Sequence, residues 1–205
     1  MRNFILASSS SSRASLLRQV IPHFRVVVPS VVESYPEVGT ASKVARLWAR
    51  RKADAVASLK DSKGAFILAA DTVVARQRQL FTTPETAEQA ASMLACFDGR
   101  RFTITTALCL IMPDRVSVTH QTTWLKFGRL GEEARAAYIA SNAWQKRAAG
   151  LDLAGAAGVF VRAMNGSWSS ALGLPLWHTR ELLISAGVDP QELLTPHPPN
   201  KQRRR

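Results

Sequence analysis

Apolar residues along the chain form two kinds of pattern. Short, nearly continuous runs are typical of strands in a sheet that is covered on both faces. Longer stretches with apolar residues three and four positions apart are typical of helices that bury one face. The strand-like runs lie at residues 3–7, 24–28, 66–74, 101–111, 115–127 and 159–164. The helix-like stretches follow residue 12, cover about 40–59, follow Pro84, cover 131–141 and follow Pro175.

Strands and helices alternate in this pattern without the regular βαβ rhythm of an all-parallel sheet. We therefore expect an α/β fold in which a mixed, twisted sheet is flanked by helices. The third helix carries the clearest start signal: Thr83 is expected at the N-cap and Pro84 at the first helical position, and Thr82 with Glu85 matches a capping box. That helix is expected to bury Ala87, Ala90, Met93, Leu94 and Phe97.

The length of 205 residues is enough for one domain with a substantial core. We expect that domain to cover residues 1–195. Residues 196–205 begin with a proline-rich stretch and continue with basic residues, a composition typical of disorder. The sequence therefore predicts one domain followed by a short basic tail.

Composition narrows the class of protein. The 46% hydrophobic and 20% charged residues are ordinary for a soluble globular protein. The longest apolar runs are about ten residues, too short to span a bilayer, and the first run is too short for a signal peptide. We therefore expect a cytoplasmic protein with no membrane partner. Cys96 and Cys109 both lie in apolar stretches, and we expect two buried thiols.

The net charge of +12 favours anionic partners, which include nucleotides, nucleic acid and acidic lipids, without choosing among them. The sequence has no Cys/His spacing typical of zinc sites. It also has neither GxxxxGK[ST] nor GxGxxG, so the common nucleotide-binding loops are absent from it. The five tryptophans are expected in the core or in pocket walls rather than on a stacking surface.

Asp71 is the most informative residue, because it lies inside the apolar run 66–74. A carboxylate buried in such a run is costly unless a cation or several hydrogen-bond donors hold it. One interpretation is an acidic group placed where chemistry needs it. The other is an aspartate at a strand end that caps a turn.

The serine run that ends in Arg13 is a second candidate. It lies between a strand and a helix, where unpaired backbone N–H groups and hydroxyls are ready to bind phosphate. A positive charge such as Arg13 in the first helical turn is unfavourable because of the helix dipole, and a bound anion nearby would offset this cost. The alternative is a solvated serine loop with an exposed arginine.

Lys52 and Glu33 complete the candidates. Lys52 follows Val44 and Trp48 on the helix face that should be buried, so it either extends outward to solvent or points into a site. Glu33 follows an apolar segment, and together with Asp71 it has the oxygen ligands that a hard divalent cation prefers. The alternative is an exposed loop glutamate.

Taken together, these segments resemble the Maf family of nucleoside triphosphate pyrophosphatases over about residues 4–187. Each motif alone is weak, but their order and spacing are specific. The motifs are Leu6-Ala7-Ser8-x-Ser10 with Arg13, Leu16 and Leu17; Glu33; Ala49-x-x-Lys52-Ala53; Ala70-Asp71-Thr72-Val73-Val74; Pro84; Gly99 with Thr106; and Gly173-Leu174-Pro175-Leu176.

This resemblance implies an elongated α/β fold with a deep central cleft, similar to inosine triphosphatase and often a homodimer. It implies hydrolysis of a nucleoside triphosphate to a monophosphate and pyrophosphate, with Mg²⁺ or Mn²⁺, on pyrimidine or on modified or non-standard nucleotides. Asp71 falls at the proton acceptor, Asp71 and Glu33 at the metal, and Thr72 at a specificity position. The implied substrate-binding residues are Ser8, Ser10, Arg13, Glu33, Lys52, Thr72 and Arg147.

The chain departs from the family pattern at several places. Ser12 replaces a second arginine, Thr82-Thr83-Pro84 replaces Gly-Lys-Pro, and Phe102 replaces a histidine. Arg147 stands where a lysine is usual and keeps its charge, while Ala154 replaces a glutamine or glutamate that reads the base. We therefore treat Ser12, Thr72 and Ala154 as positions that set specificity.

Two other functions compete with an active hydrolase. The departures favour a catalytically weakened nucleotide-binding regulator derived from the same family. The high net charge and basic tail favour a nucleic-acid-binding protein, but no recognised nucleic-acid motif is present, so we expect no specific nucleic-acid partner.

Overall fold

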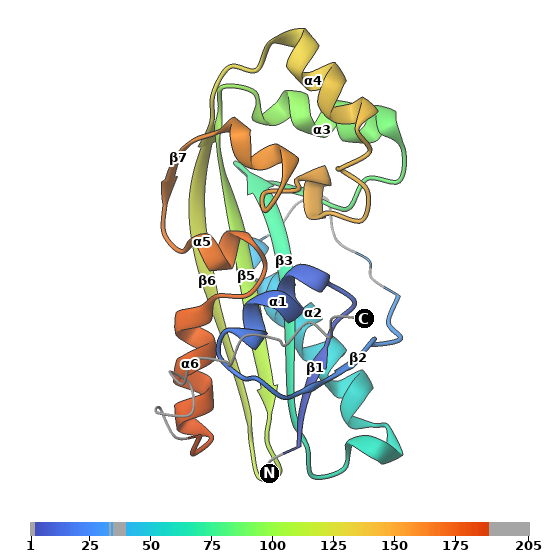
Figure 1. Ribbon diagram of the computed structural model, residues 1–205, viewed down its shortest axis with the longest axis vertical. Helices are drawn as coiled ribbons and strands as arrows, with labels where there is room; N and C mark the ends of the chain where they lie inside the picture. Colours follow the sequence, from blue (N-terminus) through green and yellow to red (C-terminus); the bar gives the residue numbers. More distant parts are fainter. Residues whose placement is uncertain (1–2, 33, 35–39, 189–205) are drawn as a thin grey trace, which may run out of the picture.

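The computed structural model describes residues 3–32, 34 and 40–188. Figure 1 shows a long sheet with helices along its faces and further helices across one end. Glu33, the end of the predicted domain at residue 195 and the predicted tail 196–205 lie outside the described residues.

Within the described ranges, seven strands form one mixed sheet in the order β2-β1-β3-β5-β6-β7, with β4 paired to β3. The pairs of β1 with β2 and with β3 are parallel, and all the other pairs are antiparallel. The strands are β1 (Phe4–Ala7), β2 (Arg25–Val27), β3 (Phe66–Arg76), β4 (Gln79–Phe81), β5 (Arg101–Ile111), β6 (Val116–Phe127) and β7 (Val161–Asn165).

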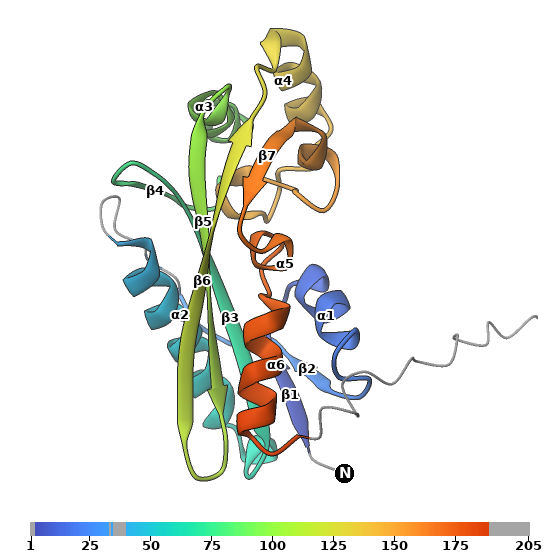
Figure 2. The same cartoon turned by 90° about the vertical axis from the view of Figure 1, so that its left-hand side faces the viewer.

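Helices cover both faces of this sheet, which confirms the predicted α/β class. Figure 2 shows α2 on one face and α1 with α6 on the other. The helices are α1 (Ser11–Arg18), α2 (Ala41–Ala57), α3 (Ala87–Phe97), α4 (Gly131–Ala140), α5 (Trp168–Ala171) and α6 (Leu176–Ser185). The 3₁₀ turns are η1 (Lys60–Ser62), η2 (Ala148–Gly150) and η3 (Ala156–Phe160). In this part of the chain, no helix is long and apolar enough to cross a membrane.

The two helical layers explain why β3 is apolar except at Asp71, Thr72 and its last residue, Arg76. Ile67 and Val73 pack in the cluster under α2, whereas Leu68 and Ala70 pack in the cluster under α1 and α6. Successive side chains of a strand point to opposite faces, so a strand covered on both faces needs apolar residues at every position. The same alternation places Asp71 on the α2 side and Thr72 on the α1 side.

A third cluster lies at the end of the sheet that α3 and α4 cover. Phe97, Phe102 and Phe127 are fully buried there, with the Phe102 ring centroid 4.6 Å from Phe97 and 4.9 Å from Phe127. Phe102, which stands where the family usually has a histidine, is therefore part of an aromatic core.

The predicted start of α3 is wrong. Thr86 is the N-cap, with its hydroxyl accepting a hydrogen bond from the Gln89 N–H at 3.3 Å, and the helix begins at Ala87. In the segment before the helix, the Thr82 carbonyl accepts a hydrogen bond from the distant Ala149 N–H at 2.9 Å. The sequence pattern also missed the short strand β4 and the short helix α5.

The two cysteines differ in burial, which corrects the expectation of two buried thiols. Cys109 in β5 is fully buried, whereas Cys96 in α3 is only partly buried. Burial raises the pKa of the Cys109 thiol to about 12. Since the thiolate is the reactive form, Cys109 is protonated and unreactive at neutral pH.

We predict that Ellman's reagent at pH 8 modifies only Cys96 in the folded protein, and both thiols in urea. Because the Cys109 pKa is raised, its thiolate fraction stays negligible at this pH. Cys96→Ser is the control and should show no reaction until the protein unfolds. Fast reaction of folded Cys96→Ser would contradict the burial of Cys109.

Candidate functional site

The candidate site forms where β3 changes its partner. β1 pairs with β3 as far as Ala69, and β4 pairs with β3 from Val74. Asp71 and Thr72 lie in the interval between these two pairings, while the other edge of β3 stays paired with β5 throughout. The chain leaving β1 turns into α1 at this interval, so that Arg13 of α1 reaches Thr72 while Lys52 of α2 reaches Asp71.

A cavity of about 930 Å³ opens at this interval. Sites for small-molecule ligands usually have volumes of roughly 300–1,000 Å³, so this one has room for a whole nucleotide. Its walls come from the start of α1, from β3, from the loop before α3, from the turn around η2 and from the end of α5. The lining residues are Ser9–Arg13, Lys52, Asp71, Thr72, Phe81, Thr82, Thr83, Glu85, Gln145–Ala148, Leu151–Ala154 and Ala171–Gly173.

Asp71 and Lys52 form a buried ion pair at the cavity. The Lys52 Nζ donates to Asp71 Oδ1 at 2.5 Å, and the two residues are 7% and 2% exposed. The apolar face of α2 carries Val44, Trp48 and Lys52 against the sheet, so the lysine reaches the strand from the covered side. Lys52 therefore points into a site rather than out to solvent, and Asp71 lies in mid-strand rather than capping a turn.

Arg13 is held by a forked contact across the cavity wall. Its Nε donates to the Gly173 carbonyl at 2.9 Å, and its Nη2 donates to Thr72 Oγ1 at 3.0 Å. Its backbone N–H donates to the hydroxyl of the N-cap Ser10 at 3.3 Å. These contacts fix the guanidinium group before any ligand is bound.

A chain of hydroxyl groups extends this contact into the sheet. The Thr72 and Thr106 hydroxyls are 2.9 Å apart, and Thr106 donates to the Ser170 carbonyl at 2.8 Å. Gly173 closes the arrangement because its φ is +100° and an added Cβ would lie 3.3 Å from Arg13 Nε and 3.4 Å from Thr72 Oγ1. A side chain at position 173 would therefore be strained and would press on Arg13.

Arg147 lies on the opposite wall. Its Nη2 is 3.3 Å from Asp152 Oδ1, and its Nη1 donates weakly to the Ser12 hydroxyl at 3.5 Å. Lys146 and Ala149, on either side of it, have φ angles of 57° and 51°. The left-handed region is unfavourable for residues other than glycine, so this turn stores strain while it holds Arg147 over the cavity.

Tyr138 holds Asp152, the residue that pairs with Arg147 in this wall. Its hydroxyl donates to the Gly150 carbonyl at 2.6 Å and accepts from the Asp152 N–H at 3.0 Å. Burial raises the pKa of Tyr138, so its hydroxyl remains protonated and can donate this bond. Asp152 is therefore a fixed carboxylate in the wall of the cavity.

The structure gathers most of the predicted residues in one place. Ser8 lies behind the wall, 3% exposed, and its hydroxyl accepts from the Ser10 N–H at 3.1 Å. Glu33 lies outside the described residues. The predicted residues that line the cavity are Ser10, Ser12, Arg13, Lys52, Asp71, Thr72, Arg147 and Ala154.

Several lining residues were missed. Glu85, Gln145 and Asp152 line the cavity, but they lie in loops where no periodic pattern marks them. The role of Thr106 depends on distant partners. The one signal for Asp152 is that it is the only acidic residue in the alanine- and glycine-rich stretch 143–158.

Comparison with known proteins decides the family. A model of the family described as Maf-like protein matches residues 3–186. The chain belongs to the Maf-like protein family. This match confirms the resemblance inferred from the motifs.

This Maf-like protein has close curated relatives over most of its length. The dTTP/UTP pyrophosphatase of Wolbachia pipientis wMel is 38% identical over 186 residues, which cover 89% of this chain and 93% of that protein. The dTTP/UTP pyrophosphatase of Bradyrhizobium diazoefficiens is 39% identical over 190 residues, 90% of this chain and 91% of that protein. The Ham1 protein of Staphylococcus aureus shares a TM-score of 0.41 at 14% identity over 62% of this chain and 72% of that one, too low to bear on the fold.

We predict that Lys52→Met destabilises the Maf-like protein by about 3–5 kcal/mol, because it removes the counterion of a buried carboxylate. The double variant Lys52→Met/Asp71→Asn should recover about half of this loss or more, since no buried charge is then left without its counterion. Urea unfolding of both single variants and the double variant measures the coupling free energy. Additive losses would show that the two side chains do not interact.

Proposed function

We propose that this protein hydrolyses nucleoside triphosphates to monophosphate and pyrophosphate. The observation that carries the proposal is the buried Lys52–Asp71 pair, which opens into a nucleotide-sized cavity beside the start of α1. A protein with 38% identity over nearly the same length is named a dTTP/UTP pyrophosphatase. The geometry and the relatives therefore support the same reaction.

The chemistry follows from the placement of charges. A water molecule attacks the α-phosphorus while negative charge grows on the leaving pyrophosphate. Asp71 accepts the proton of that water, as a positioned carboxylate can. Lys52 and Arg13 lie where they can neutralise the phosphate charge, and Arg13 is already fixed by its bonds to Gly173 and Thr72.

A divalent cation, Mg²⁺ or Mn²⁺, is part of the proposal. Among the described residues, no three His, Cys, Asp or Glu side chains cluster as a metal cage. Mg²⁺ commonly uses one or two protein carboxylates and completes its shell with substrate phosphates and water. Asp71, which lines the cavity, would be such a carboxylate, and the bound cation would neutralise charge on the phosphates. Glu33 is the second proposed ligand.

The charges also orient the substrate. Glu85 and Asp152 line the end of the cavity formed by the loop before α3 and the turn around η2. Arg147 pairs with Asp152 there, whereas Arg13 and the N–H groups at the start of α1 attract phosphate, so we place the triphosphate toward α1 and the base toward the other end. Ala154 lies at the base end, whereas Thr72 and Ser12 contact Arg13 and Arg147. We propose dTTP and UTP as first candidates, with modified or non-standard nucleotides next.

A weakened regulator would bind nucleotide without turnover. The contact between Arg147 and Ser12 argues for the enzyme, because it brings a guanidinium group to the position where a second arginine is missing. The homodimer and the cytoplasmic location remain predictions.

We predict that Asp71→Asn lowers pyrophosphate release from dTTP and UTP by roughly 10²–10⁴-fold, because a positioned proton acceptor contributes that much. The assay uses purified protein with Mg²⁺, and circular dichroism checks the fold. Asp54→Asn is the matched control, since Asp54 is an exposed carboxylate on the same helix as Lys52 and pairs with Arg50 at 2.8 Å. Nucleotide binding by the wild type without turnover would favour the regulator, and full activity of Asp71→Asn would exclude the proposed role of Asp71.

We predict that Thr106→Val lowers kcat/KM by about fivefold, since removal of one hydrogen bond near 1 kcal/mol leaves Thr72 and Arg13 less firmly held. Thr105→Val is the matched control. Thr105 is the neighbouring residue in β5, is also buried, and its hydroxyl lies 2.9 Å from that of Thr122. Steady-state kinetics and urea unfolding should show similar stability losses but a kinetic loss only at position 106. Equal kinetics in the two variants would contradict a positioning role for Thr106.

A further inference from the structure

The face of the sheet that α2 covers continues past the helix and carries an exposed tryptophan. Trp124 and Val118 are an even number of residues apart on β6, so their side chains point to the same face of the sheet. Val118 packs in the cluster under α2. The register of β5, β6 and β7 then places two rows of side chains together on this face. The rows are Thr103, Trp124 and Asn165, and Arg101, Lys126 and Ala163.

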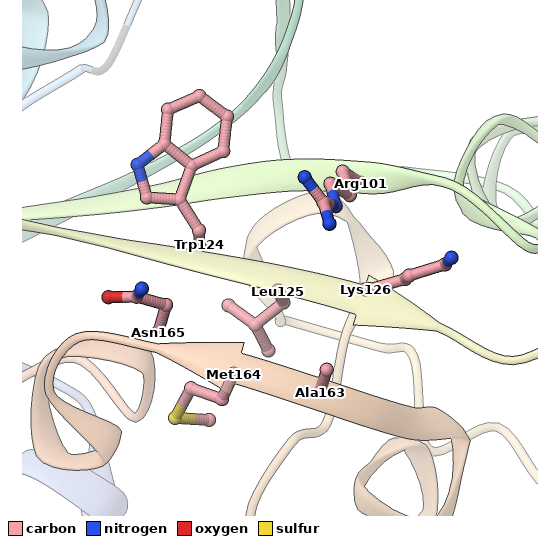
Figure 3. A pocket seen from close by; sticks show the side chains of 7 residues that line it. All are labelled: Arg101, Trp124, Leu125, Lys126, Ala163, Met164 and Asn165. Carbon is pink, nitrogen blue, oxygen red and sulfur yellow. The ribbon is translucent and has the colours of Figure 1, made fainter.

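These rows enclose a hollow of about 220 Å³, which Figure 3 shows from close by. Trp124 is 56% exposed, and in Figure 3 its ring and the Arg101 side chain lie over β5. Ala163 contributes only a methyl group, which leaves space in front of the strands. The residues that line the hollow are Arg101, Trp124, Leu125, Lys126, Ala163, Met164 and Asn165.

The exposure of Trp124 needs an explanation. The sequence led us to expect all five tryptophans in the core or in pocket walls, and this is wrong for three of them: Trp48 and Trp144 are buried, but Trp124, Trp168 and Trp177 are 53–64% exposed. A large aromatic side chain left exposed beside a hollow is typical of a binding surface. An indole ring offers a flat face for stacking at little cost in side-chain entropy.

The charge of the hollow indicates an anionic occupant. Arg101 and Lys126 lie directly opposite each other on β5 and β6. Among the described residues that line the hollow, none is acidic, and the whole chain carries a net charge of +12. The two cations therefore attract an anion beside the tryptophan.

We propose that this hollow is a second binding site that takes one nucleotide unit. The base stacks on Trp124, and the phosphate lies between Arg101 and Lys126. The Asn165 side-chain amide, which can both donate and accept, pairs with an edge of the base. An aromatic stacking surface beside cations is the arrangement that proteins use to bind single nucleotides of a strand without strict sequence preference.

The site is separate from the candidate active site. The two hollows share no lining residue among those that the structure describes. At about 220 Å³ it is smaller than the roughly 300–1,000 Å³ usual for a fully enclosed ligand. It therefore suits one base and sugar with the phosphate at the rim, in a free mononucleotide or in a single strand.

The test compares two exposed tryptophans. Trp124→Ala removes the proposed stacking surface. Trp177→Ala is the matched control, because Trp177 is 64% exposed and also has an arginine, Arg180, 5.5 Å from its ring centroid. Isothermal titration with dTMP measures the number of sites, and fluorescence anisotropy with fluorescein-labelled ten-residue oligo-dT measures affinity for a strand.

We expect Trp124→Ala to weaken binding at this site by about 5- to 150-fold, the range that base stacking contributes, and Trp177→Ala to leave it unchanged. Arg101→Ala/Lys126→Ala should reduce the dependence of oligo-dT affinity on salt by about 0.7 unit of slope for each phosphate of the single strand that the protein no longer neutralises. Loss of only the dTMP site assigns the hollow to free nucleotides, and loss of oligo-dT binding assigns it to strands.

Two results would overturn the proposal. One is identical binding of both ligands by Trp124→Ala and the wild type. The other is conversion of a dimer to a monomer by Trp124→Ala, seen by light scattering, with nucleotide binding unchanged, because this face would then join two copies of the chain. Pyrophosphate release by Trp124→Ala should match the wild type, so failure of this proposal is distinct from failure of the proposed function.

Discussion

The ion pair between Lys52 and Asp71 is the interaction on which the rest of the site depends. Removing two charges from water costs several kcal/mol per ion, so a buried pair at 2.5 Å is not an obvious source of stability. Its position explains why it is kept. It lies on β3 between the end of its pairing with β1 and the start of its pairing with β4. The sheet opens toward the cavity at this interval.

The surrounding elements hold this interval open and keep its charges in place. The buried stripe of α2 delivers Lys52 from one side of the sheet, and α1 delivers Arg13 from the other. Thr106 and Gly173 then fix Arg13 and Thr72 from behind. A polyphosphate entering the cavity meets cations whose positions are already set, which reduces the reorganisation that binding requires.

The sequence predicted what depends on local pattern. The apolar runs indicated the strands, and the i, i+4 stripe placed Lys52 on the covered face of its helix. It could not predict contacts between distant segments. The Thr82 carbonyl accepts from the distant Ala149 N–H, and Asp152 lies in an irregular stretch. Thr105 and Thr106 cannot be distinguished from the sequence. Because neighbouring side chains of a strand point to opposite faces, they have different hydrogen-bond partners. Trp124 is exposed because α2 ends before reaching it, and no residue near it in the sequence signals this.

A crystal structure of Asp71→Asn with the α,β-methylene analogue of dTTP, whose bond between the α- and β-phosphates cannot be hydrolysed, tests the central claim most directly. We predict the α-phosphate beside Lys52 and residue 71, the outer phosphates toward Arg13 and the start of α1, and the base near Asp152 and Ala154. A triphosphate seated away from Lys52 and residue 71, with the larger cavity empty, would contradict this account.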